Sequence, residues 1–427
     1  MHLLQLCPRV PFPLHDGGAI AMYEVARGLS QLGHRVTVLA INTPKHHQPA
    51  DVLDHLGPLV RLVTVDVNTD LSVWRALRNL VFSGLPYNVE RFINGKIFGK
   101  LTKIISEDKI DIIQFEGTFV APYLHHLDLE RLGLEGTDEG NKLQIPFVLR
   151  AHNIEHTIWQ MLAARAANPL KKIYLKNMAV RLARFERAEL PRFDAVVAIT
   201  APDAGRLRAL GCPEPVAFIA AGVDLTRFQP DAGIVPKPKT LFLLGSLNWL
   251  PNQEGLAWLL REVWPLAHAE MPDLTLHVAG TGAPATLLTA PPAGVVMHGF
   301  VASAPDFMRQ FDLMLVPLLS GGGMRVKIIE GLALGKVILS TALGAEGIAV
   351  QDGRDIVLRD SAAEWLAAIR AWHRAELPVA AISAAAVRTA AELYDTRQVA
   401  RRFEELYARL LPASIVPAPK IPAAPLR

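Results

Sequence analysis

The chain has 427 residues, of which 51% are hydrophobic and 20% charged, and its formal net charge is +3. A chain of this length is longer than a single domain with one hydrophobic core usually is, so two domains of similar size are expected. The small net charge argues against a general nucleic-acid binder, which needs a concentrated basic face. The two cysteines, Cys7 and Cys212, lie far apart, which argues against a disulfide scaffold and a cysteine-based metal site.

Targeting signals are not evident in the sequence. The N-terminal apolar run is short, follows no basic leader and ends at Pro8 and Arg9, so no signal peptide is expected. The most apolar region, 331–350, carries Lys336 and Glu346, and no window approaches the roughly 18 uncharged residues of a membrane span. We therefore expect a cytoplasmic protein, attached at most peripherally to the inner face of a membrane.

In the first half, short apolar runs alternate with longer amphipathic segments, which is the pattern of βα units and parallel sheets. Runs rich in Val, Ile, Leu or Phe predict strands at His2–Cys7, Arg35–Ile41, Leu59–Val67, Asp111–Glu116, Pro146–Ala151, Ala195–Thr200 and Val216–Ala221. The proline-rich stretch 229–240 has no apolar period, and we interpret it as a linker.

The same alternation restarts after the linker. Strands are predicted at Leu241–Gly245, Leu274–Ala279, Val295–Val301, Leu313–Leu318, Val337–Thr341 and Ile356–Leu358. Helices are predicted at Asn252–Glu270, Asp306–Phe311 and Met324–Leu334, and three more close the chain, the last at Thr396–Leu411. The Pro/Ala-rich tail 412–427 cannot build a core and is expected to be disordered.

This alternation predicts an α/β fold of two doubly wound Rossmann-like domains, residues 1–228 and 241–393. Each doubly wound sheet offers a crevice beyond the carboxyl ends of its strands. If the two edges face each other, a ligand lies between the domains, and hinge closure can exclude water from it.

The sharpest local signal is the turn VPLLSGGGMRVKIIEG, in which a predicted strand runs into three glycines and a helix. Glycines let the backbone approach a ligand, and a helix start presents unpaired amides, so a diphosphate is the expected ligand. Arg325 and Lys327 fall in the predicted first turn, where a bound anion offsets their unfavourable interaction with the helix dipole. Glu330, further along, can accept hydrogen bonds from ribose hydroxyls. The alternative is a plain tight turn followed by three solvated side chains.

These residues resemble the retaining glycosyltransferases of family 4, which have the GT-B fold. The resemblance runs through nearly the whole chain, in the segments PFPLHDGGAIAMYEVARGLSQLGHRVTVLA, AGVDLTRFQP, LFLLGSLNWLPNQEGLAWLL, LTLHVAG with VVMHGFV, and GGGMRVKIIEGLALGKVILSTALGAEG. It implies that residues 1–228 form the acceptor-side domain and residues 241–393 the nucleotide-sugar donor domain. The helix at 394–411 would return to the N-terminal domain.

The resemblance also implies roles for residues of the first domain. Gly17 and Gly18 would form the loop under the donor diphosphate. His152, in RAHNIEH at a strand end, matches the family's cleft histidine, which contacts the transferred sugar. Two further candidates rest on their positions in the sequence and not on the resemblance. Glu116, at another strand end, would touch the acceptor or cap the next helix, and Asp16 would cap a helix or touch the acceptor.

In the second domain, Glu330 matches the second glutamate of the family's paired-glutamate motif, the ribose ligand. The backbone near Phe300 and Val301 would meet the base. The groups expected around the diphosphate are the backbone of Gly322, Gly323 and Met324 and the cations of Arg325 and Lys327.

Two departures from the family pattern concern this same site. The first glutamate of the pair falls at Gly322, and the Arg and Lys that usually follow the opening strand of the second domain are absent from GSLNWLPNQEG. We infer that Arg325 and Lys327 supply the missing positive charge from the next loop.

The resemblance implies transfer with retention of configuration, in which the acceptor attacks on the face that the leaving phosphate departs from and that phosphate takes the acceptor proton. His152, Arg325 and Lys327 would be the catalytic residues, because preorganised donors aimed at the developing charge supply most of the rate enhancement. No cofactor and no metal are expected. The donor would be a UDP- or GDP-sugar, and the acceptor a saccharide or a lipid-linked saccharide, in cell-surface polysaccharide or glycoconjugate synthesis.

The segment from Lys171 to Arg192 is rich in Lys and Arg, which suits either contact with anionic lipid or an ordinary solvated helix face. Two other functions stay open at this point. One is a sugar-nucleotide epimerase of the same fold, and the other is a catalytically inactive nucleotide-sugar-binding protein. No nucleic-acid partner is expected.

Overall fold

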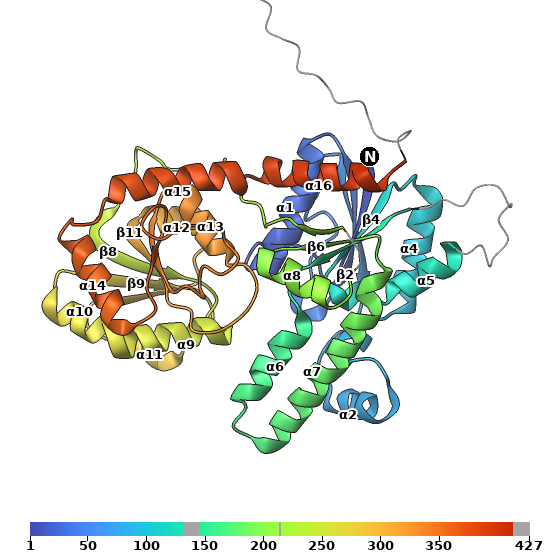
Figure 1. The fold of residues 1–427 in the computed structure, drawn as a ribbon, viewed down its shortest axis with the longest axis horizontal. Helices are drawn as coiled ribbons and strands as arrows, with labels where there is room; N and C mark the ends of the chain where they lie inside the picture. Colours follow the sequence, from blue (N-terminus) through green and yellow to red (C-terminus); the bar gives the residue numbers. More distant parts are fainter. Residues whose placement is uncertain (132–144, 213–214, 413–427) are drawn as a thin grey trace, which may run out of the picture.

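The computed structural model describes residues 1–131, 145–212 and 215–412, with no side chains described for 128–131. Two parallel sheets lie side by side along the long axis of the molecule (Figure 1). The predicted α/β class is therefore confirmed. Beyond Pro412, the predicted disordered tail 412–427 lies outside the described residues.

The first sheet has the order β3-β2-β1-β4-β5-β6-β7, so its strand order reverses between β1 and β4. All its pairs are parallel. Its strands span β1 His2–Cys7, β2 Arg35–Asn42, β3 Val60–Asp66, β4 Ile112–Glu116, β5 Phe147–Ala151, β6 Ala195–Ala198 and β7 Val216–Phe218. The reversal is the position at which doubly wound sheets bind ligands, beyond the carboxyl ends of the strands.

The second sheet has the order β10-β9-β8-β11-β12-β13, with its reversal between β8 and β11. Its strands span β8 Lys237–Leu244, β9 Thr275–Ala279, β10 Val295–Gly299, β11 Phe311–Val316, β12 Val337–Ser340 and β13 Val357–Leu358. The strand β8 begins inside the predicted linker 229–240. Its first residue pairs with Phe311 although the sequence KPKT carries no apolar signal.

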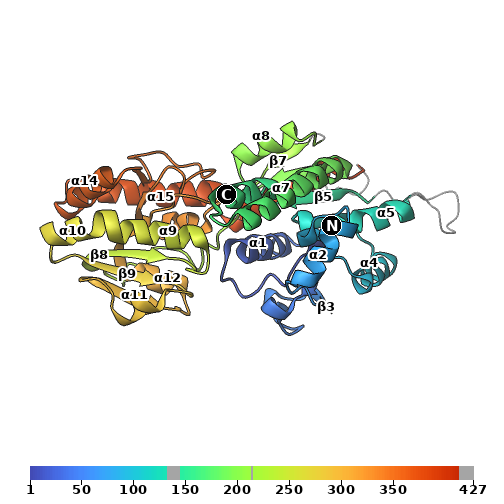
Figure 2. The ribbon, with the colours of Figure 1, turned by 90° about the horizontal axis from the view of Figure 1, so that it is seen from below.

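Helices cover both faces of the sheets, as the view of the second domain in Figure 2 shows. In the first half they span α1 Gly17–Gln31, α2 Val73–Phe82, α3 Tyr87–Glu90, α4 Gly95–Glu107, α5 Tyr123–Arg131, α6 Glu155–Arg165, α7 Pro169–Glu189 and α8 Ala201–Ala209. In the second half they span α9 Leu250–Trp258, α10 Trp264–Glu270, α11 Ala285–Thr289, α12 Ala304–Arg309, α13 Val326–Ala333, α14 Ala362–His373, α15 Val379–Leu393 and α16 Thr396–Leu410. A π-helical turn, Leu259–Val263, joins α9 to α10 within the helix predicted at Asn252–Glu270.

The last helix, α16, leaves the second half of the molecule and lies on the first sheet (Figure 1). Its apolar side chains recur every three or four residues, and they are buried against α1 and the first sheet. The chain enters α16 beside the segment that follows β7, where the amide of Thr396 donates to the carbonyl of Val223 at 3.1 Å. The chain thus crosses between the two sheets twice, at neighbouring places.

A testable consequence concerns Gly28, where α1 and α16 touch. A Cβ at Gly28 would lie 2.9 Å from both the Ala400 Cβ and the Thr396 carbonyl oxygen, whereas a Cβ at Gly99 in α4 meets nothing within 4 Å. Gly28→Ala should therefore lower the free energy of unfolding by about 1–3 kcal/mol through overpacking. Gly99→Ala should raise it by about 0.5–1 kcal/mol through helix propensity. Chemical denaturation of both variants would measure these opposite signs, and a stabilised Gly28→Ala would contradict the packing described here.

Candidate active site

The start of α1 lies against the start of α13, across the gap between the two sheets. Asp16 caps α1, since its side chain accepts hydrogen bonds from the amides of Gly18 and Ala19 at 3.0 and 3.1 Å. A Cβ at Gly17 would lie 3.4 Å from Cγ2 of Val326, the first residue of α13. Two helix N-termini, each favourable for an anion, therefore converge from the two halves of the molecule.

Asp16 is a half-exposed carboxylate that is already engaged. Besides capping α1, it pairs with the guanidinium of Arg9, a cation that our sequence analysis did not single out. Burial raises the pKa of Asp16, but the bonds from Arg9 and from two amides lower it by more. The net effect is a pKa below the usual value. Arg9 sits at the edge of the Gly17–Gly18 turn, because a Cβ at Gly18 would lie 3.3 Å from its Nη2.

The glycine-rich turn leads into α13, which begins at Val326, two residues later than predicted. Arg325 is therefore the N-cap residue, with non-helical φ and ψ of −88° and 85°, and not a first-turn residue. Its guanidinium donates to the carbonyl oxygens of Gly321, Gly323 and Leu343. Only 4% of Arg325 is exposed, so this cation stabilises the turn through its bonds to the carbonyl oxygens and is not a solvent-exposed group of the cleft.

No side chain caps α13, so the amides of its first turn have no side-chain acceptor among the described residues. An N-terminus without a cap leaves donors that a bound anion can satisfy. The turn itself lies against the first domain, since a Cβ at Gly323 would come within 2.6 Å of the Asn153 side-chain oxygen and 3.9 Å of the His152 carbonyl oxygen.

Lys327 reaches from α13 to the carboxyl end of β8. Its ammonium group donates to the Leu244 carbonyl oxygen at 3.2 Å and to Oδ1 of Asn252 at 3.0 Å. This is the place after the opening strand of the second domain where basic residues were expected and are missing from the sequence. Burial, and then the nearby Arg325 cation, lower the pKa of Lys327 to about 8.

Glu330 lies one turn beyond Lys327 in α13, and 8% of it is exposed. Burial raises its pKa to about 7, against the opposing effect of Arg227. No hydrogen bond to its carboxylate from another side chain of the described residues is present. The group therefore has free acceptor capacity, as a ligand for hydroxyl groups requires.

His152 follows β5 and is held from beneath by Glu116, the last residue of β4. The Nε2 atom of His152 lies 2.6 Å from Oε2 of Glu116, whose side chain is fully buried. The acceptor contact and the helix-cap role predicted for Glu116 do not fit this geometry, because the carboxylate exposes no surface to a ligand and bonds to His152. Although burial raises the pKa of Glu116, the Arg150 cation and the bond from His152 bring it below its usual value.

The Glu116 carboxylate belongs to a larger buried network that the sequence analysis missed. Gln5 and Gln114 donate to Oε1 of Glu116 at 2.7 and 2.6 Å, and Arg150 lies 3.8 Å from its other oxygen. The hydroxyl of Tyr407 in α16 donates to Oε1 of Gln114. A signal was available in the strands HLLQLC, IIQFE and FVLRA, because each places at least one long polar side chain in a mostly apolar, buried run.

Phe300 and Val301 are the predicted neighbours of the base. They follow β10, at the carboxyl edge of the second sheet. Phe300 is 57% exposed, and its ring meets the ring of His15 edge-on, with centroids 5.3 Å apart. Val301 packs partly against the core of the second half. An exposed aromatic ring beside the start of α1 suits contact with a flat base.

A cavity of about 310 Å³ opens between the two halves beside the glycine turn. Both halves line it, with Gly321–Gly323 and Glu346 on one side and Asn153, Thr200, Asp203 and Arg206 on the other. Ion pairs across the gap join Arg206 to Glu346 at 3.6 Å and Arg165 to Glu254 at 2.9 Å. Of the predicted residues, Gly322 and Gly323 line this cavity, and His152, Gly17 and Met324 lie around the same glycine turn outside its lining.

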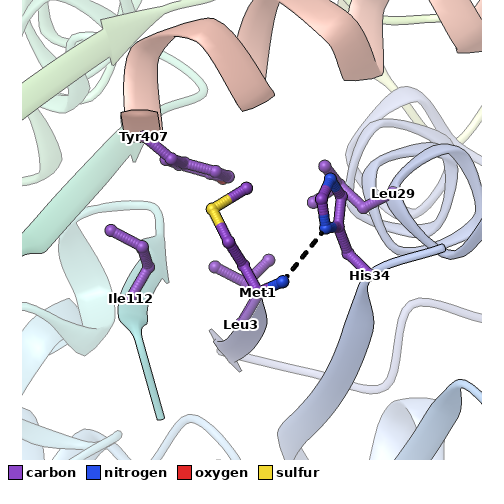
Figure 3. A pocket seen from close by; sticks show the side chains of 6 residues that line it. All are labelled: Met1, Leu3, Leu29, His34, Ile112 and Tyr407. Carbon is purple, nitrogen blue, oxygen red and sulfur yellow. Dashed lines mark hydrogen bonds between the residues drawn. The ribbon is translucent and has the colours of Figure 1, made fainter. Parts of the chain in front are cut away.

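A second cavity lies away from this cleft, at the amino end of β1 between α1 and α16 (Figure 3). It has a volume of only about 10 Å³, and Met1, His34 and Tyr407 are among the side chains that line it. Such a space is about the size of one water molecule, so it offers no site for a substrate.

Two further findings concern the described residues only. None of their His, Cys, Asp and Glu side chains form a group of three or more placed to hold a metal ion. None of their helices combines the length and the apolar character that a membrane span needs.

Comparison with known families assigns both halves of the chain. Residues 15–227 match the family described as Glycosyltransferase Family 4, and residues 238–374 match the family described as Glycosyl transferases group 1. A 44.6 kDa protein "in cps region" of Klebsiella pneumoniae is 23% identical over 358 residues, which are 82% of this chain and 84% of that protein.

Solved structures resemble the whole fold. Sucrose-phosphate synthase from Thermosynechococcus elongatus matches with a TM-score of 0.68 and 16% identity, over 96% of this chain and 99% of its own. HepE from Anabaena, solved in complex with UDP and glucose, matches with a TM-score of 0.61 and 14% identity, over 95% and 99% of the two chains. Two sheets whose carboxyl edges enclose one cleft, together with the two family matches, show that this chain belongs to glycosyltransferase family 4 and is a glycosyltransferase with the GT-B fold.

Proposed function

We propose that the enzyme transfers a sugar from UDP or GDP to a saccharide or lipid-linked acceptor, with retention of configuration and without a metal ion, in cell-surface polysaccharide or glycoconjugate synthesis. The observation that carries the proposal is the uncapped N-terminus of α13 facing the start of α1. A nucleoside diphosphate as donor is supported by the UDP bound in HepE. The cell-surface role is supported by the relative in the Klebsiella cps region.

In this proposal, the donor lies with its diphosphate between the two helix starts. The amides of Gly322, Gly323 and Met324 donate to the phosphate oxygens, and Lys327 adds a cation from the end of β8. Arg325 contributes its charge from within the turn and keeps the amides aimed at the ligand. Glu330 accepts hydrogen bonds from the ribose hydroxyls, and the base meets Phe300 and the backbone at Val301.

In the chemical step, the bond between the anomeric carbon and the phosphate oxygen breaks, and negative charge builds on the leaving phosphate. The acceptor oxygen bonds to the same carbon on the same face and passes its proton to that phosphate. Donors that are fixed before the reaction stabilise this charge without reorganising. His152 contacts the transferred sugar, and Glu116 fixes the orientation of its ring.

The acceptor enters, in this proposal, through the cavity lined by Asn153, Thr200 and Arg206. The size of this cavity, about 310 Å³, fits one sugar unit of an acceptor rather than a large ligand. Peripheral contact with an anionic membrane, expected from the basic segment 171–192, is part of the same proposal.

The central experiment screens UDP-, GDP- and ADP-sugars by thermal shift and then supplies the stabilising donor with saccharide acceptors. A ligand at about 100 times its dissociation constant stabilises the fold by about 2.7 kcal/mol. NMR of the product should show the anomeric configuration of the donor, and activity should survive EDTA. An inverted product or loss of activity in EDTA would contradict the mechanism, and donor epimerisation without transfer would favour an epimerase.

Lys327→Ala should weaken UDP binding by about 10- to 100-fold, which corresponds to the loss of about 1.5–3 kcal/mol from a charged hydrogen bond. Isothermal titration calorimetry would measure it. The matched control is Lys336→Ala, which removes another buried lysine that donates to carbonyl oxygens, at the opposite end of the same sheet. If both variants bind UDP equally well, Lys327 does not contact the donor.

Glu116→Gln should lower kcat by about tenfold or more while leaving the Kd for UDP unchanged, because the substitution weakens the hold on His152 and not the nucleotide site. Glu189→Gln is the control, since Glu189 makes a similar 2.7 Å contact with His125 on the same domain. Steady-state kinetics and calorimetry separate the two effects. A fall in nucleotide affinity with unchanged kcat would refute the positioning role of Glu116.

The affinity for UDP should depend on pH on both sides of neutrality. Burial raises the pKa of Glu330 to about 7, so its carboxylate is lost as the pH falls below this value. The pKa of Lys327 is lowered to about 8, so its positive charge is lost as the pH rises above that value. Titrations between pH 5.5 and about 9 should therefore show an optimum between these limits. Glu330→Gln should remove the acidic limb only, and an unchanged acidic limb would exclude Glu330 as the titrating group.

A further inference from the structure

Helix α2, Val73–Phe82, presents its apolar side to solvent. Its sequence VWRALRNLVF places Val73, Trp74, Leu77, Leu80 and Val81 within about 120° of one another, at about 100° per residue. An apolar stripe of this kind normally packs on a core. Here, Asn79 alone is buried among the residues of α2, and it lies on the opposite side of the helix.

The exposure of these side chains is large. The exposed fractions are 83% for Trp74, 84% for Phe82, 75% for Val73 and 71% for Val81. Leu71, just before the helix, is 78% exposed. Single exposed apolar residues are ordinary, but a contiguous apolar stripe that includes the ring of Trp74 marks a binding surface.

Polar contacts through Asn79 attach α2 to the rest of the fold. The Asn79 amide donates to the Leu85 carbonyl oxygen at 2.9 Å and to Glu90 at 2.7 Å. Arg181 of α7 donates to Oδ1 of Asn79 at 3.0 Å and to the carbonyl of Ser83. These bonds fix which side of α2 faces the protein, so the outward direction of the apolar side is built into the structure.

The surroundings of this apolar face are basic. Arg75 and Arg78 are exposed on α2, and residues 71–82 contain no acidic side chain. Helix α7 is the second helix of the α6–α7 hairpin and lies beside α2 (Figure 1). It contains no acidic residue from 169 to 185, and it exposes Lys171, Lys176 and Arg184 there. Exposed Leu170 and Ile173 occupy the same part of α7, at 77% and 66%.

We propose that the outward face of α2, together with the basic start of α7, docks the enzyme onto an anionic lipid surface. An interfacial helix lies in the plane of the membrane with its apolar side among the acyl chains and its cations at the lipid headgroups. The apolar stripe of α2 matches this arrangement, with the exposed Arg78 at its flank. This docking adds to the proposed function the surface at which the enzyme meets a lipid-linked acceptor. Only the statement about the acceptor rests on the proposed function.

A second copy of the chain fits this face less well. A two-fold contact places the same patch against itself, so the arginines of α2 and the lysines of α7 would approach their own copies. Like charges at close range oppose such a contact, whereas anionic headgroups neutralise them.

The test is vesicle flotation of the full chain with phosphatidylcholine alone and with added phosphatidylglycerol. The wild type should float with the anionic vesicles, and less so at high salt. Trp74→Ser/Leu77→Ser should lower the partition coefficient by at least about tenfold, because two large apolar side chains of the stripe no longer insert. Val81→Ser should lower it more than Val235→Ser, which changes a valine of 86% exposure on the second half. Arg75→Gln/Arg78→Gln should reduce the preference for anionic vesicles.

Thermal unfolding and UDP binding of each variant keep the outcomes separate. Both should stay at wild-type values, since α2 contributes little to the core and lies outside the donor site. Equal flotation of wild type and Trp74→Ser/Leu77→Ser would overturn the proposal. The proposal would also be overturned if light scattering showed a dimeric wild type and a monomeric variant, because the face would then bind a second copy of the chain. Failure to bind any nucleotide-sugar would count against the proposed donor and not against the lipid surface.

Discussion

The approach of α1 to α13 is the constraint on which the rest of the active site depends. Each helix starts beyond the strand-order reversal of its own sheet, at the point where such sheets bind ligands. Asp16 caps the first amides of α1, whereas α13 has no side-chain cap among the described residues. A Cβ at position 17 would lie 3.4 Å from Cγ2 of Val326, an ordinary van der Waals distance, so the two helix starts are in direct contact. An anionic ligand at this place satisfies the uncapped amides of α13 and lies next to the start of α1, and its charge adds to the ion pairs that already join the two halves.

Charge in this site is held in place by backbone carbonyl groups more than by carboxylates. Arg325 bonds to three carbonyl oxygens, and Lys327 bonds to one carbonyl and one amide oxygen. Neither cation is paired with a carboxylate of the residues that the structure describes, so the charge of both is available to a diphosphate. This arrangement explains how the site remains positive although the family's usual basic residues after β8 are missing.

Most of the fold could be predicted from the sequence, because buried parallel strands read as continuous apolar runs. The bounds of β1 were predicted to the residue, and the glycine turn before α13 was found from its composition. The direction of side chains could not be predicted in the same way. That Glu116 faces His152 depends on β4 lying beside β5, and that Lys327 reaches Leu244 depends on the position of α13 over β8. The stripe of α2 reads as a buried face, and its outward direction follows only from the bonds of Asn79.

The paired crossing of the chain at Val223 and Thr396 has a consequence for the integrity of the enzyme. Because α16 belongs in sequence to the second half but is buried in the first, a protease that cuts between Phe228 and Lys237 would not release either half. The C-terminal fragment would stay docked through α16 as a non-covalent complementing piece, much as a split protein retains its partner. The same fastening forces any opening of the cleft to bend two neighbouring chain segments together, which permits rocking and resists twisting.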